Sequence, residues 1–101
     1  MKYELRILPS ADSDLEDLFD FISHQSSRTR AVAYVQQLQD ACFALEKYPF
    51  RGRAREDLAA GLRSITVAGR AVVVYRVADI VVEIVHIFYA GRDYGTDDFK
   101  Q

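Results

Sequence analysis

Basic, histidine and tyrosine side chains gather in the C-terminal part of the chain, and together their types could cleave RNA. Cleavage of RNA by its own 2′-hydroxyl needs a base near that hydroxyl, a donor for the leaving oxygen and cations around the phosphorane. The side chains that could serve are Arg63, Arg70, Arg76, His86, Tyr89, Arg92, Asp93 and Tyr94. The arginines would supply the cations, and His86 or Tyr94 would transfer the proton. Any arginine-rich sheet offers a similar set, so this signal is weak.

Two other interpretations of the arginines stay open. They could line the rim of a sheet in solvent or pair with Glu83 and Asp93, because a buried guanidinium is costly without a partner. Alternatively, they could form a cationic, half-apolar face that receives an acidic or amphipathic ligand.

The elements that must position these residues lie in the stretch from Leu62 to Asp93, which predicts three consecutive strands. Val, Ile, Tyr and Phe dominate it, and it is broken only at 68–70 and 78–80. Such short breaks are typical of hairpins, so the three strands should run antiparallel.

Both faces of these strands are apolar. In the middle strand, Val72 and Val74 share a face with Arg76, opposite Val73, Tyr75 and Val77. By the same alternation, in the last strand Val82, Ile84, His86 and Phe88 should oppose Val81, Val85 and Ile87. His86 could therefore lie in the core or point into a groove.

The first half of the chain predicts a strand and two helices. Residues 2–8 alternate as a strand with one buried face, and Pro9 ends it. Ser10 is placed as the N-cap of a helix that reaches about His24, whose acids form a solvated face. A second helix begins at Arg28 after a Ser26-Ser27 cap and stops at 48–49.

One sheet and one helical hairpin predict an α+β fold, in which the helices cover one face of an antiparallel sheet. The other apolar face would be under-covered and completed by something else, such as a protein partner. The segment 50–60, which contains Arg51, Arg53 and Arg55, is expected to be a solvated loop.

Length and composition predict one ordinary globular domain over residues 1–101. The net charge is −2, which argues against a general nucleic-acid coat. No direct sequence-specific nucleic-acid binding is expected either. Charge is nevertheless segregated: five acids and no base lie in 12–20, whereas seven bases and two acids lie in 47–76.

Cys42 is the only cysteine, which excludes an internal disulfide and disfavours a structural zinc site. Cys42 lies on the apolar stripe of its helix and is expected in the core. We expect no cofactor and no metal. No apolar run approaches the about 18 residues of a membrane span, and the N-terminus lacks a signal-peptide core. A reducing, cytoplasmic setting is therefore expected.

The order of residues resembles the ParE-type toxins of bacterial type II toxin–antitoxin systems, within the ParE/RelE toxin superfamily. The similar segments cover nearly the whole chain. They are the opening strand with Pro9-Ser10-Ala11 and Asp14-Leu15, then Leu45 with Pro49, Gly52-Arg53, Asp57-Leu58, Gly61-Leu62-Arg63-Ser64, the strand 72–77, Glu83-Ile84-Val85 with Ile87, and Ala90-Gly91-Arg92-Asp93. The resemblance implies a β-α-α-β-β-β fold, a ParD-like antitoxin as partner and, for the ParE branch, DNA gyrase as target.

The RelE branch of the same superfamily implies a different activity, ribosome-dependent cleavage of messenger RNA. Its basic residues would correspond to Arg63, Arg70 and Arg92, with His86 or Tyr94 in proton transfer. After Arg92, however, the sequence is Asp-Tyr-Gly-Thr-Asp-Asp-Phe, and carboxylates there would repel an RNA backbone. A non-enzymatic inhibitor of gyrase is therefore preferred, and a ribonuclease is the alternative. The partner-facing residues are predicted to be Arg63, Arg70, Tyr75, Arg76 and Arg92.

Overall fold

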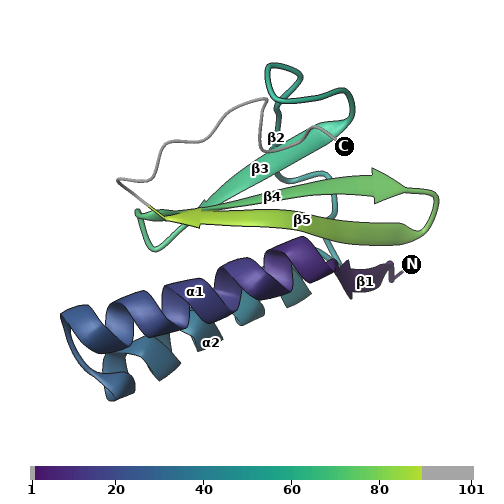
Figure 1. Cartoon of the computed structure of the whole chain (residues 1–101). Helices are drawn as coiled ribbons and strands as arrows, with labels where there is room; N and C mark the ends of the chain where they lie inside the picture. The colour runs from purple at the N-terminus through teal and green to yellow at the C-terminus, as the bar shows by residue number, and fades with distance from the viewer. Residues whose placement is uncertain (1, 90–101) are drawn as a thin grey trace.

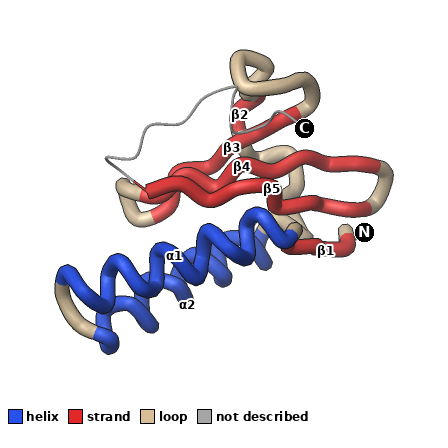
Figure 2. Tube along the Cα trace, in the orientation of Figure 1, coloured by secondary structure: helices blue, strands red, loops and turns tan. Residues whose placement is uncertain are grey.

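A computed structural model describes residues 2–89 and shows two α-helices lying along one side of a five-stranded sheet (Figure 1). The elements follow one another as β1 (Glu4–Ile7), α1 (Pro9–Gln25), α2 (Arg28–Ala44), β2 (Arg53–Ala54), β3 (Leu62–Val67), β4 (Ala71–Ala78) and β5 (Val81–Tyr89). The α+β prediction is confirmed, with both helices on one face and the strands stacked above them (Figure 2).

The sheet has the order β1-β5-β4-β3-β2. The two predicted hairpins are present, because β3 pairs antiparallel with β4 and β4 pairs antiparallel with β5. The prediction of a wholly antiparallel sheet is corrected at one edge, where β1 pairs parallel with β5 from Glu4↔Val81 to Ile7↔Ile84. The helical hairpin and three strands separate β1 from β5 in the sequence, so the edge of β5 is completed by a strand distant in the chain.

The segment after α2 is more ordered than the solvated loop that its charges predict. It contains β2, which pairs antiparallel with β3, and it buries Leu58. Leu58 packs with Leu62, Val74 and Phe88 on the face of the sheet away from the helices. The segment that contains Leu58 therefore covers the centre of this second face. This corrects the prediction that the apolar residues there are left for a partner to cover.

The main core lies between the helices and the sheet. Ala11, Leu15, Leu18 and Ile22 of α1 meet residues of all three long strands there, and Leu38, Cys42 and Leu45 join them. Cys42 is buried as predicted, and burial raises the pKa of its thiol to about 11. It therefore remains a neutral thiol at physiological pH.

A β-bulge in β5 overturns the simple alternation expected there. Val74 pairs with His86 whereas Tyr75 pairs with Ile84, so Val85 is the extra residue. Ile84 and Ile87 consequently both join the helix-side core, and Phe88 lies in the opposite cluster. The predicted grouping of Ile84 with Phe88 is wrong because one inserted residue reverses the faces beyond it.

Candidate functional site

The start of α1 differs from the prediction and brings a carboxylate onto the sheet. The helix begins at Pro9, with Leu8 in the N-cap position and no side-chain cap. Proline suits a first helical position because its missing N–H would have no intrahelical partner. Ser10 is thus not the cap, and its hydroxyl donates instead to the carbonyl of Val85. At α2 the Ser27 cap is confirmed, since its hydroxyl accepts from the N–H of Arg30.

Asp14 is buried with 8% of its surface exposed, although the acids of α1 were expected on a solvated face. Its Oδ2 accepts a hydrogen bond from the N–H of Ile87 at 2.9 Å and lies 2.8 Å from Nδ1 of His86. A signal for this burial exists in the sequence. Asp14 stands three residues after Ala11 and four before Leu18, and so lies on the buried stripe of the helix.

Ser10 and Asp14 together extend the edge pairing of β5 beyond β1. The last backbone hydrogen bond on this edge runs from the N–H of Leu8 to the carbonyl of Ile84. Beyond it, Ser10 binds the carbonyl of Val85 and Asp14 binds the N–H of Ile87. Backbone groups at a sheet edge need such partners when they are buried. The primary role of Asp14 in this geometry is therefore to attach α1 to β5, and it also orients the His86 ring.

The arginines predicted to act together do not converge. Arg63 faces Tyr75 across the β3–β4 pair and so shares the helix side, whereas Arg76 lies on the opposite face and donates to Glu83 at 2.6 Å. Arg70, in the turn before β4, is separated from Arg76 by six residues, or roughly 20 Å of strand. Arg70 lies 3.5 Å from the hydroxyl of Tyr89. These three side chains cannot surround one phosphate.

Two predicted residues have structural roles. Tyr75 is fully buried; its hydroxyl donates to the carbonyl of Pro49 at 2.8 Å and accepts from the N–H of Gly52 at 2.9 Å. It cannot face a partner, so its assignment as a partner-facing residue is corrected. Burial raises the pKa of Tyr75. Arg63 donates to the carbonyl of Gly52 at 2.8 Å, which fixes the same loop.

Of the remaining predicted site residues near the end of the chain, the structure describes Tyr89 alone. Tyr89 packs against the rings of Phe21 and Tyr34, at centroid distances of 5.8 and 5.6 Å. Arg92, Asp93 and Tyr94 lie outside the described residues, as does the whole segment that follows β5. Between residues 2 and 89, no three acidic, histidine or cysteine side chains come together as a metal site. No helix in the same range could cross a membrane.

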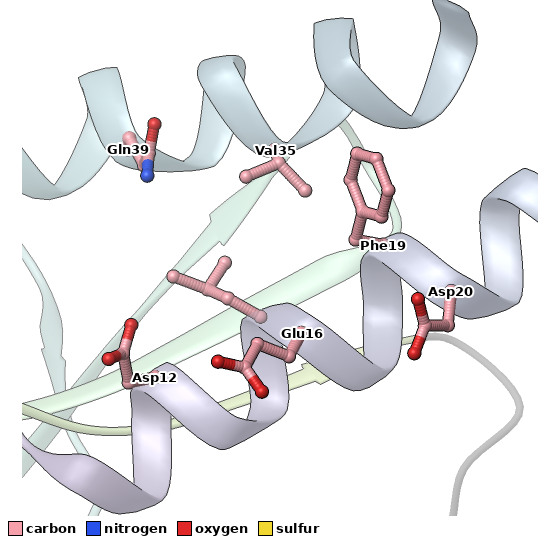
Figure 3. Close-up of a pocket in the computed structure, with 7 residues that line it drawn as sticks. Asp12, Glu16, Phe19, Asp20, Val35 and Gln39 are labelled. Carbon is pink, nitrogen blue, oxygen red and sulfur yellow. The ribbon is translucent and has the colours of Figure 1, made fainter. Parts of the chain in front are cut away.

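An acidic groove of about 430 Å³ lies between the two helices (Figure 3). Leu15, Phe19 and Val35 provide its apolar lining. Its acidic side chains are Asp12, Glu16 and Asp20, which repeat every four residues along α1 and so share one face. This groove collects three of the five acids that the sequence places in 12–20. Its chemistry suits a basic segment that carries apolar side chains.

Comparisons with known proteins agree with this fold. Residues 5–94 match the family described as the ParE toxin of type II toxin–antitoxin systems, parDE. No curated protein matches the chain at the level of sequence.

Three solved structures share the architecture. The chromosomal ParDE system of P. aeruginosa is 20% identical with a TM-score of 0.78, covering 88% of this chain and 97% of that one. The RelBE2 toxin–antitoxin complex of Mycobacterium tuberculosis is 22% identical with a TM-score of 0.67, covering 88% and 99%. A mutant of the E. coli toxin RelE in the free state is 20% identical with a TM-score of 0.59, covering 90% and 86%.

At these identities the structures establish the fold, and the family match extends over most of the chain. The chain belongs to the ParE toxin family of type II toxin–antitoxin systems.

Proposed function

We propose that this toxin arrests growth by binding and inhibiting DNA gyrase, and that a ParD-like antitoxin neutralises it in the cytoplasm. Membership of the ParE family supports the toxin role. The observation that favours binding over catalysis is the separation of Arg63 from Arg70. Arg63 pairs with Tyr75 in the middle of β4, whereas Arg70 precedes the start of β4 at Ala71, roughly 13 Å away along the strand. A ribonuclease would need such cations around one phosphorane.

The antitoxin has a suitable surface in the acidic groove between α1 and α2. An amphipathic helix commonly binds such a groove through apolar side chains at helical spacing. Basic residues flanking those side chains would face Asp12, Glu16 and Asp20. The groove is formed by the two helices and contains none of the arginines of the sheet. An antitoxin bound in the groove would therefore leave those arginines free to contact another part of the same antitoxin.

The decisive experiment is a gyrase supercoiling and DNA-cleavage assay with purified toxin, with and without a stoichiometric excess of antitoxin. Loss of supercoiling with trapped cleaved DNA, reversed by the antitoxin, is the expected result. Full gyrase activity in the presence of a toxin preparation that still arrests cells would contradict the proposal.

A ribosome-dependent ribonuclease is the second candidate, and the Asp14–His86 pair is the observation in its favour. A carboxylate bound to Nδ1 fixes the tautomer of a histidine and can prepare its other nitrogen for proton transfer. In this mechanism, His86→Gln or Tyr94→Phe would abolish cleavage of ribosome-bound messenger RNA while the fold remains intact. Retained toxicity in both variants would exclude it.

A further inference from the structure

The last turn of α2, the connection that follows it and the start of β2 expose aromatic rings beside basic side chains. Phe43, Tyr48 and Phe50 fall within eight residues, and 54%, 62% and 56% of their respective surfaces are exposed. Exposed basic residues accompany these rings between the last turn of α2 and β2, and we call the whole set the aromatic–basic surface. It comprises Phe43, Lys47, Tyr48, Phe50, Arg51 and Arg53. Exposed aromatic side chains grouped in this way commonly mark an interaction site.

Buried groups beneath the connection hold its backbone in place. The Tyr75 hydroxyl bonds the carbonyl of Pro49 and the N–H of Gly52, on either side of Phe50. Arg63 holds the carbonyl of Gly52 from the neighbouring strand. A Cβ at Gly52 would lie 2.5 Å from the Tyr75 hydroxyl. The backbone at position 52 can therefore come this close to Tyr75 only because the residue is glycine. The outward position of Phe50 is therefore fixed by the core beneath it.

The Phe50 ring is also positioned by its neighbours. The guanidinium of Arg63 lies over it, 5.1 Å from the ring centroid, and the Tyr3 ring meets it edge-on at 6.1 Å. These contacts restrain the ring while leaving about half of its surface open. A preordered aromatic side chain loses little conformational entropy on binding, which is characteristic of interface residues that contribute most to affinity.

A hollow of about 450 Å³ adjoins the aromatic–basic surface. It is lined by Lys2, Phe43, Ala44, Glu46 and Lys47. Glu46 lies 3.7 Å from the ammonium of Lys2, so the acid is largely compensated. The Tyr3 backbone N–H donates to the carbonyl of Glu46, which places the hollow next to the ring pair of Tyr3 and Phe50. The surface thus offers both a recess and exposed positive charge.

We infer that the aromatic–basic surface binds the protein target of the toxin, through an acidic segment of the target that carries apolar side chains. The inference rests on the proposed function and assigns the gyrase-facing surface to this connection. Apolar side chains would enter the hollow and cover Phe50, and carboxylates would face Lys47, Arg51 and Arg53. Single-stranded nucleic acid also stacks on aromatic rings, but the net charge of −2 does not favour a polyanion.

The test measures binding of the purified toxin to purified gyrase, together with inhibition of supercoiling. Phe50→Ala, Phe43→Ala and the double variant Lys47→Glu/Arg51→Glu are each expected to weaken binding about 10-fold or more. Matched controls are Val32→Ala, with 52% of its surface exposed on α2, and Arg28→Glu/Arg30→Glu at the start of the same helix. The controls should bind within about 2-fold of the wild type. Thermal melting verifies that each variant is folded.

The outcomes distinguish failure of the proposed gyrase inhibition from failure of the inference about the aromatic–basic surface. A wild-type toxin that neither binds nor inhibits gyrase overturns the proposed function and this inference with it. Wild-type inhibition with folded variants that bind equally well overturns the inference alone. A labelled single-stranded DNA oligonucleotide serves as a further probe. Binding of this probe that depends on Phe50, with gyrase binding unchanged, would assign the surface to nucleic acid and also overturn the inference.

Discussion

The Asp14 carboxylate lies 2.8 Å from Nδ1 of His86, across the junction between α1 and β5. The same carboxylate oxygen accepts from the backbone of Ile87. One buried acid therefore attaches the first helix to the last described strand through both a side chain and the main chain.

We expect Asp14→Ala to lower the free energy of unfolding by about 1–3 kcal/mol, because it removes the acceptor of a buried N–H. Asp14→Asn should cost less, since its amide oxygen can still accept from Ile87. Urea denaturation measures both changes. The exposed acid Asp17 on the same helix provides the control, and an equal loss from Asp17→Ala would contradict the assignment.

The Tyr75 hydroxyl predicts a second loss of stability. Tyr75→Phe keeps the ring but removes the partner of Pro49 and Gly52, so we expect a cost of about 1–3 kcal/mol in chemical denaturation. Tyr48→Phe alters a tyrosine that is 62% exposed and should change stability by less than about 0.5 kcal/mol. If the two variants unfold at the same urea concentration, the hydroxyl does not stabilise the loop.

Alkaline pH should destabilise the fold through Cys42. Burial raises the pKa of its thiol from 9.0 to about 11, so the folded state holds the proton more tightly than the unfolded chain. This contribution is complete below about pH 9 and is lost as the pH rises through 11. The integrated loss is about 3 kcal/mol.

Melting temperatures measured across this alkaline range test the prediction, with Cys42→Ala as the comparison. The variant loses packing at every pH, but its stability should fall less steeply between the unfolded and folded pKa values of the thiol. Burial raises the pKa of Tyr75 as well, so a residual slope is expected in both proteins. Identical slopes would show that the thiol does not contribute.

The growth arrest that we propose for this toxin should survive His86→Gln. A glutamine amide can donate to Asp14 in place of the imidazole, and an inhibitor that acts by binding needs no proton transfer at this position. Induced expression without antitoxin, followed by growth curves, measures the effect. A folded His86→Gln protein that permits normal growth would support the catalytic alternative.

The predictions that succeeded depend on residues close in sequence. The helical stripes of α1 and α2 and the two short breaks around β4 are local patterns, and they identify the helices and hairpins correctly. The parallel pairing of β1 with β5 brings together residues as distant as Glu4 and Val81, and no local pattern specifies it. The Val85 bulge likewise depends on the pairing partner.

The candidate site was predicted less completely for a related reason. Residue types identified the arginines, but whether they converge depends on strand register and face, which placed Arg63 and Arg76 on opposite sides. The role of Tyr75 depends on a loop 23 residues earlier in the chain reaching its hydroxyl. The burial of Asp14 could have been predicted from its helical spacing, whereas its bond to Ile87 could not.

The parallel pairing of β1 with β5 also determines when the sheet can be completed during synthesis of the chain. Residues 4–7 have no sheet partner until residues 81–84 have been synthesised, so β1 stays unpaired while the residues between them are made. Contacts of such large sequence separation slow folding, because a long loop must close before they form. A translating ribosome therefore carries an incomplete sheet until the last described strand has been made.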